Sequence, residues 1–207
     1  MRAVLQKVLR ASVTVDERVV GEISRGVCVL VGIQADDTLA DLEYIAKKIL
    51  TLRVFQQDPL DASSAHWKKS IVDLDLEVLC VSQFTLCAKT TKGAKPDFHQ
   101  AMGSERSRDM FDRLVGRLGE LHDPGRVRTG AFGEMMQVAL VNDGPVTLTL
   151  DSRKFSYETQ QQQPTGDAQK DRVAEKARAK DLRRQAFTSS SSGSSTPSST
   201  TLNTKDS

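Results

Sequence analysis

The chain has 207 residues, of which 38% are hydrophobic, and its formal net charge at pH 7 is +2. This length predicts one domain followed by a further segment, and residues 1–154 contain 21 basic and 21 acidic side chains. A neutral domain gives no electrostatic argument for RNA binding, so any phosphate contacts would have to come from a local basic patch.

The first part of the domain reads as strands followed by a helix. Alternating or continuous apolar residues predict strands at 3–9, 11–15, 19–23 and 27–33. Thr38 with Asp41 three residues later resembles a capping box, so a helix should begin there and present an apolar face as far as Leu50.

The later part supplies a buried strand, a second helix and an interrupted strand. Residues 76–81 form an apolar run typical of a buried strand, and residues 104–121 have the apolar spacing of an amphipathic helix. Residues 136–150 would read as one strand without Pro145, which cannot donate to a sheet ladder. Two interpretations remain open: a tight turn between two strands, or a break inside one. These elements predict an α+β domain with a curved antiparallel sheet and flanking helices.

The composition changes after the domain. We assign residues 1–154 to the folded domain and residues 155–207 to a disordered, polar and charged tail whose end is rich in Ser and Thr. Residues 168–187 could instead form a charged helix that contacts nucleic acid or protein, with phosphorylation of the serines tuning it.

No conventional catalytic constellation is evident. His66, His99 and His122 lack metal-ligand spacing, so no metal is predicted. Ser82 or Thr85 with His99 as base is conceivable, but neither hydroxyl lies in a Gly-x-Ser-x-Gly elbow. Neither a phosphate-binding loop nor a dinucleotide fingerprint occurs, so no organic cofactor is predicted.

The cysteines and the lengths of the apolar runs indicate the cellular compartment of the protein. Cys28, Cys80 and Cys87 form no CxxC pair, and two of them lie in apolar runs, which predicts reduced, buried thiols. The sequence has neither a secretory leader at Met1 nor an apolar run near 18 residues, so secretion and membrane contact are not expected. We expect a cytoplasmic protein and leave nuclear presence open.

Two motifs carry a family resemblance. The sequences SQFTL at 82–86 and NDGPVT at 142–147 resemble those of the D-aminoacyl-tRNA deacylases, and the likeness extends from residue 1 to about 150. Further similar segments are QKVLRASVTV at 6–15, RVF at 53–55, KPDFH at 95–99 and FGEMMQV at 132–138.

The resemblance implies an activity and an assembly. Such enzymes hydrolyse the ester of D-aminoacyl-tRNA and also release glycine from glycyl-tRNA, and their fold is a barrel-like sheet in a two-fold homodimer. It further implies that Gly144 and Pro145 form a cis peptide that enters the other subunit's site. There it would point carbonyl groups at the substrate's α-amino group, so that an L side chain collides and a D side chain does not.

The resemblance also assigns the pocket. Ser82, Gln83, Phe84 and Thr85 would line the site of the terminal adenosine, and Phe132 and Met136 would form apolar walls. On residue type alone, ordinary core packing is the favoured interpretation for Phe84, Phe132 and Met136, and only the motif match reverses it. The resemblance leaves chemistry to a water activated by the RNA 2′-hydroxyl, with the Phe84 and Thr85 N–H groups at the oxyanion and the Thr85 hydroxyl in a positioning role.

Lys7 departs from the family pattern, which usually has arginine there to hold the Gly-Pro loop. Lysine offers a flexible point charge in place of a planar fork of donors, so the loop should be held differently. A related animal deacylase keeps its Gly-Pro bond in trans and has Pro-Gln-Ala in place of the Ser82-Gln83-Phe84 segment, which argues against that relative. The alternative function is a nucleic-acid-binding regulatory protein that uses this fold as a scaffold and acts through residues 155–207.

Overall fold

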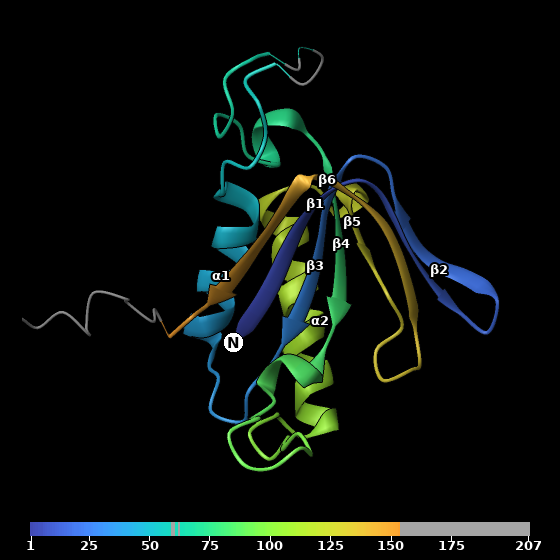
Figure 1. The fold of residues 1–207 in the computed structure, drawn as a ribbon, viewed down its shortest axis with the longest axis vertical. Coiled ribbons are helices and arrows are strands. Elements are labelled where there is room, and N and C mark those ends of the chain that lie inside the picture. Colours follow the sequence, from blue (N-terminus) through green and yellow to red (C-terminus); the bar gives the residue numbers. More distant parts are fainter. Residues whose placement is uncertain (59–60, 62, 154–207) are drawn as a thin grey trace, which may run out of the picture. The chain divides into compact units, whose positions relative to one another are not determined.

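The computed structural model describes residues 1–58, 61 and 63–153. The described chain forms one six-stranded sheet (Figure 1). Five strands run in the order β2-β1-β3-β4-β5, in which β2 and β3 pair with different parts of β1. The sixth strand, β6, lies off this path and also pairs with β1. The strands are β1 (Arg2–Val15), β2 (Arg18–Ile23), β3 (Gly26–Gly32), β4 (Glu77–Ser82), β5 (Val127–Thr129) and β6 (Gln137–Asp151).

The sheet is mixed, so the prediction of a purely antiparallel sheet was wrong. β1 is antiparallel to β2, β3 and β6, but β3 pairs in parallel with β4, and β4 with β5. A hairpin can join only antiparallel neighbours, whereas parallel neighbours need a long crossover. Two helices provide these crossovers: α1 (Leu39–Thr51) lies between β3 and β4 in sequence, and α2 (Ser104–Leu121) between β4 and β5.

The sheet curls until its edges nearly meet. Gly21 in β2 lies so close to β5 that a Cβ added to it would fall 2.1 Å from the Thr129 carbonyl oxygen. Only glycine allows two backbones to approach this closely. The barrel-like shape expected from the family resemblance is therefore present, and the α+β class is confirmed.

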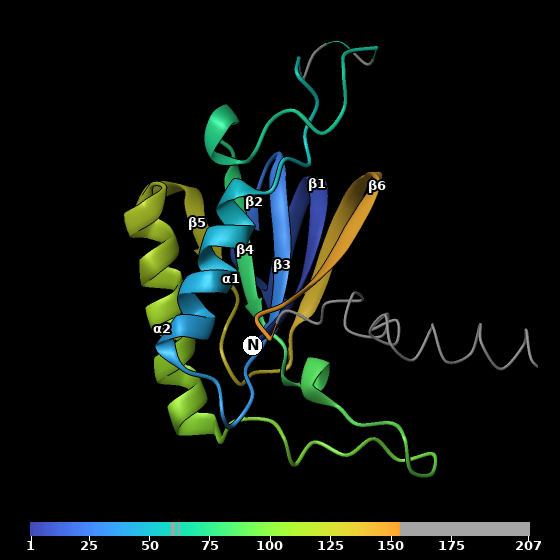
Figure 2. The same cartoon turned by 90° about the vertical axis from the view of Figure 1, so that its left-hand side faces the viewer.

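Both helices lie against the same side of the sheet (Figure 2). Thr38 and Asp41 form the expected capping box at the start of α1, and α2 has the bounds that its apolar spacing predicted. The main core fills the space between sheet and helices, where Phe55 and Leu114 are fully buried. The buried faces consist of Leu42, Ile45, Ala46, Ile49 and Leu50 in α1 and Phe111, Leu114, Leu118 and Gly119 in α2.

Two pairs of predicted strands are continuous strands in the structure. The segments predicted at 3–9 and 11–15 form the single strand β1, in which the exposed Leu9 and Arg10 lie where the pairing with β6 changes register. The interrupted stretch around Pro145 is the single strand β6. Of the two interpretations, the break inside one strand is confirmed: residues 143–146, which we call the Gly-Pro turn, lie outside the ladder with β1.

The three cysteines are free and buried, as predicted. Burial raises the pKa of Cys28 to about 11 and that of Cys80 to about 12. Thiols held in this protonated state are poor nucleophiles and metal ligands. Within the described ranges, no helix has the length and apolar character needed to cross a membrane.

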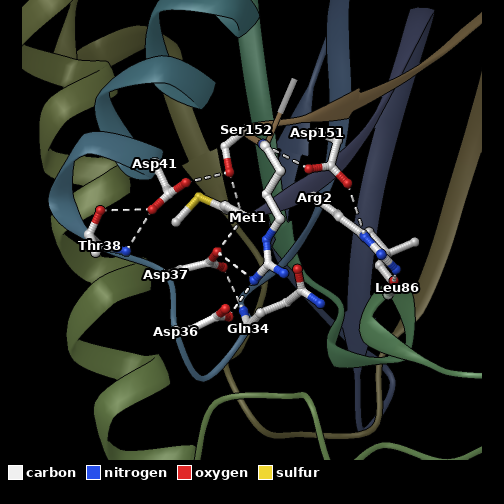
Figure 3. Close-up of polar contacts among 11 residues, drawn as sticks. Met1, Arg2, Gln34, Asp36, Asp37, Thr38, Asp41, Leu86, Asp151 and Ser152 are labelled. Carbon is white, nitrogen blue, oxygen red and sulfur yellow. Dashed lines mark hydrogen bonds and ion pairs between the residues drawn. The ribbon is translucent and has the colours of Figure 1, made fainter. Parts of the chain in front are cut away.

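A buried polar network ties the start of β1 to α1 and to the end of β6 (Figure 3). The α-ammonium group of Met1 pairs with Asp37 and donates to the Ser152 hydroxyl at 2.7 Å. The Ser152 hydroxyl donates in turn to Asp41 at 2.7 Å, and the Ser152 amide donates to the Met1 carbonyl at 3.0 Å. Three elements distant in sequence thus share one set of hydrogen bonds.

Asp41 should make stability depend on acid pH. Its partial burial raises the pKa, but hydrogen bonds from Ser152 and Thr38 outweigh this and lower the pKa from its usual 3.8 to about 2. Because the folded-state pKa is depressed, the stabilisation is complete above about pH 4 and is lost as the pH falls toward 2. Asp41→Asn should therefore have a lower free energy of unfolding in urea than wild type at pH 6. This difference should shrink as the pH falls from about 4 toward 2. A gap that stayed constant from pH 6 to pH 2 would contradict this origin.

Candidate functional site

The six pocket residues predicted from the sequence lie around one cavity of about 630 Å³. It opens where β3 and β4 end, beside the first turn of α2 and the loop before β6. A cavity of this volume is in the range of small-ligand sites. The predicted residues lining it are Ser82, Gln83, Phe84, Thr85, Phe132 and Met136.

Close packing behind the cavity fixes the turn that follows β4. The Gln83 amide donates to the Val31 carbonyl at 2.7 Å, and the short 3-10 helix η2 (Phe84–Cys87) begins at the next residue. Gly32 lies directly behind η2, and a Cβ there would come within 2.8 Å of the Leu86 Cβ. The absence of a side chain at Gly32 therefore lets η2 sit against β3.

The polar groups of the turn pair with each other. The Gln83 side-chain amide donates to the Thr85 hydroxyl at 2.6 Å. His99, considered as a base for Thr85, does not line this cavity, and its imidazole pairs with Asp97 instead. Hydrogen bonds from the backbone and ring of His99 lower the pKa of Asp97. His99 is therefore not placed to act as a general base for the Thr85 hydroxyl.

The apolar residues of the cavity differ in their packing. Phe84 is 58% exposed, which excludes ordinary core packing for this ring, and it meets Phe98 edge to face with centroids 5.1 Å apart. Phe132 and Met136 are partly buried at the margins of the two core clusters, and both line the cavity. These two side chains therefore pack against the core and form the cavity wall at the same time.

Sequence reasoning missed the contribution of α2. The Arg108 guanidinium lies 4.8 Å from the centre of the Phe132 ring and donates to the Phe132 carbonyl at 3.0 Å. Ser104 and Ser107, one turn apart, also line the cavity. Their spacing places them on one helix face, but polar residues on a helix surface are usually solvated, so the sequence alone did not single them out.

Gly144 and Pro145 lie elsewhere, beside a second cavity of about 490 Å³ that Lys7 also lines. The Gly144–Pro145 peptide bond is cis, and Gly144 has φ +119°. The pairing of β6 with β1 shifts register opposite Lys7, which lets residues 143–146 leave the regular ladder. Within one chain, the residues implied for the chiral screen and those implied for adenosine binding therefore line different cavities.

Three side-chain contacts hold this turn. The Asn142 amide donates to the Thr147 hydroxyl at 2.9 Å, while its oxygen accepts from the Val146 amide at 3.2 Å. The Lys7 ammonium lies 2.9 Å from the Asp143 carboxylate, with only 6% of the lysine side chain exposed. Lys7 is thus a buried cation whose charge is matched by the residue that precedes Gly144.

These features define a domain with a curled sheet, a cavity of small-ligand size at the end of that sheet, and a strand turn beside a second cavity. A family model described as D-Tyr-tRNA(Tyr) deacylase matches residues 4–151. The chain belongs to this family. The match spans both cavities, both helices and all six strands except the first two residues of β1.

Named relatives agree with this assignment. A D-aminoacyl-tRNA deacylase of Drosophila melanogaster is 48% identical over 152 residues, covering 73% of this chain and 92% of the relative. The Schizosaccharomyces pombe protein of the same name is 44% identical over 154 residues, 74% of this chain and all of that protein. Human D-aminoacyl-tRNA deacylase 1 is 47% identical over 152 residues, 73% of this chain and 70% of the human protein.

Two solved structures share the fold. One, titled c-Myc DNA Unwinding Element Binding Protein, has a TM-score of 0.68 and 47% identity over 73% of this chain and 98% of that chain. Another, titled as a probable eukaryotic D-amino acid tRNA deacylase, has a TM-score of 0.63 over 72% of this chain and 98% of that chain. At 20% identity, the second shows the fold alone. The predicted tail at 155–207 lies outside the described residues.

Proposed function

We propose that the protein hydrolyses the ester of D-aminoacyl-tRNA to free amino acid and tRNA, and acts on glycyl-tRNA in the same way. The observation that carries this proposal is the convergence of the six family-motif residues on one cavity in a chain of the deacylase family. Release of D-amino acids from tRNA would make this a proofreading activity of translation, exercised in the cytoplasm.

The terminal adenosine binds in the larger cavity. Its base contacts the exposed ring of Phe84 on one side and the wall of Phe132 and Met136 on the other. Unpaired bases in RNA commonly stack on aromatic side chains in this way. The Arg108 contact with Phe132 keeps that wall in place. Ser82 and Gln83 supply the polar groups that orient the nucleoside.

The carbonyl of the ester is held by backbone N–H groups. The first N–H groups of a helical turn have no partner inside that turn, and in η2 these belong to Phe84 and Thr85. Donors fixed in this way stabilise the charge that develops on a carbonyl oxygen during ester hydrolysis. The Thr85 hydroxyl, engaged by Gln83, positions this turn, and the attacking water is activated by the 2′-hydroxyl of the substrate itself.

Rejection of L-amino acids requires a second copy of the chain. Because Gly144 and Pro145 line a different cavity from Phe84, they reach an adenosine pocket only when another subunit presents them. Met135, 92% exposed at the rim of the adenosine cavity, and Val138, 37% exposed beside it, supply apolar surface for such a homodimer.

Hydrolysis of three matched substrates tests the proposal. The purified full-length chain should release amino acid from D-tyrosyl-tRNA and glycyl-tRNA and leave L-tyrosyl-tRNA intact. Hydrolysis of the L ester as well would show that a Gly-Pro turn held by the Lys7–Asp143 pair does not exclude L-amino acids. Failure to hydrolyse any ester would refute the deacylase assignment and favour a nucleic-acid-binding regulator acting through residues 155–207.

A further inference from the structure

The tryptophan of the second cavity has no role in the function proposed above. Trp67 is the sole tryptophan of the chain, it is 57% exposed, and it lines the 490 Å³ cavity together with His66, Gly144 and Pro145. Large aromatic side chains are normally buried, so one held in solvent beside a candidate site needs a reason.

The backbone at Trp67 is also unusual. Its φ is +61°, in the left-handed region that bulky residues rarely adopt. Such a conformation persists only where the surrounding structure holds it, and such positions cluster at ligand sites. The segment is held here: the amides of Lys68 and Lys69 donate to the Phe55 carbonyl at 2.9 and 3.2 Å, and Phe55 is fully buried.

The same residue connects Trp67 to the Gly-Pro turn. The Phe55 ring lies 5.5 Å from the Lys7 ammonium, which pairs with Asp143 next to Gly144. Contacts through Phe55 and Lys7 thus fix the position of Trp67 relative to Gly144. A ligand bound on the indole would therefore have a fixed position relative to the Gly-Pro turn.

The charge around the indole suits an anionic ligand. Lys68 follows Trp67 and is exposed, and no ion pair of Lys68 occurs among the described residues. The carboxylate lining the cavity, Asp143, is already matched by Lys7. An exposed ring beside an unmatched cation is the combination that binds single-stranded nucleic acid, because bases stack and phosphates pair with the cation.

We propose that Trp67 and Lys68 form a platform for the single-stranded nucleotides that precede the terminal adenosine of the RNA substrate. The proposal rests on the deacylase function and on the presentation of Gly144 to a second subunit. A platform beside Gly144 then lies at the mouth of that subunit's adenosine cavity, where the preceding nucleotides emerge. The indole stacks on a base, and Lys68 neutralises a phosphate.

Fluorescence tests the binding without any reaction. Because the chain has one tryptophan, its emission reports on Trp67 alone. Uncharged tRNA, and a short single-stranded RNA with the sequence of its 3′ end, should quench this emission, whereas a blunt RNA duplex should not. Emission unchanged by RNA in a chain that hydrolyses D-tyrosyl-tRNA would overturn the platform and leave the function standing. An indole covered by a second copy would instead change emission with protein concentration, and would also overturn it.

Kinetics with variants separates the platform from a structural role. Trp67→Ala should raise KM for D-tyrosyl-tRNA roughly 5- to 150-fold. It should leave hydrolysis of D-tyrosyl-adenosine, which lacks the preceding nucleotides, unchanged, and Trp67→Phe should restore most of the loss. Leu39→Ala, at an exposed apolar residue of α1, is the matched control and should change neither substrate. Equal losses on both substrates with Trp67→Ala would mean that the residue only supports the fold.

Salt dependence tests Lys68. A lysine that neutralises one phosphate of a single strand should lower the slope of log affinity against log salt by roughly 0.7 when it is removed. Lys68→Ala should show this change in the tRNA titration, and Lys47→Ala, at an exposed lysine of α1 away from the second cavity, should not. Identical slopes for wild type and Lys68→Ala would remove Lys68 from the platform.

Discussion

Gly144→Ala should abolish deacylation while leaving a folded chain. A Cβ at this position would lie 2.8 Å from the Val146 Cγ2 and 3.0 Å from the Val146 amide nitrogen. The φ of +119° is also a conformation that L side chains rarely adopt. The turn would therefore have to shift, and the added methyl would occupy space next to the substrate. A displacement of about 1 Å at a reacting centre costs on the order of 10²-fold in rate.

The measurement is kcat/KM on D-tyrosyl-tRNA together with the thermal midpoint of unfolding. Gly93→Ala is the matched control, because Gly93 also has a positive φ of +67° but has no atom within 4 Å of an added Cβ. It should keep wild-type activity. A Gly144→Ala chain as active as the Gly93→Ala chain would refute the proposed screen.

Mixed dimers extend this result to the question of which subunit supplies the turn. Phe84→Ala should weaken adenosine binding in its own cavity and leave its Gly144 intact. Coexpressed with Gly144→Ala, it would form mixed dimers in which one of the two sites has both an intact cavity and an intact turn. Activity of the separated mixed dimer well above either parent is expected. Activity equal to the parents' average would show that each turn serves its own chain.

Asp37→Ala should produce the largest loss of stability. The carboxylate is 1% exposed and pairs with the fully buried ammonium group of Met1, and it also accepts from the Gln34 amide at 2.6 Å. Removing one partner leaves the other as an uncompensated buried charge, which costs about 3–5 kcal/mol. Met1 also touches Ser152 at the end of β6, so the loss should loosen the junction of the three elements in Figure 3.

Urea unfolding and the thermal midpoint measure this loss. For a domain of this size the cost corresponds to a fall in Tm of roughly 6–20 °C. The neighbouring Asp36→Ala is the control: its side chain is 74% exposed and pairs with Arg153, a contact worth roughly 0–1 kcal/mol. Equal destabilisation by both substitutions would mean that burial of the Met1–Asp37 ion pair does not add to the stability of the fold.

Local patterns in the sequence predicted both helices and most of the strands, and the family resemblance assigned the residues of the larger cavity. Apolar spacing gave α2 with its observed bounds, and the Thr38–Asp41 pattern gave the start of α1, because helix periodicity and capping depend on residues within a few positions of each other. The segment at 82–86 was placed at the end of a buried strand, where it is observed. The family resemblance then grouped it with Phe132 and Met136.

Tertiary structure alone decided strand direction, closure and the partners of individual charges. A strand's sequence reports which faces are buried but not which neighbour it pairs with, so the parallel pairing of β3 with β4 was not foreseen. The Lys7–Asp143 pair and the exposure of Trp67 likewise depend on contacts between segments far apart in the chain. The sequence by itself determined both helices, the two motifs and every strand but β5, although it divided β1 into two. Only the fold decided that these motifs line separate cavities, because their separation depends on how β6 packs beside β1.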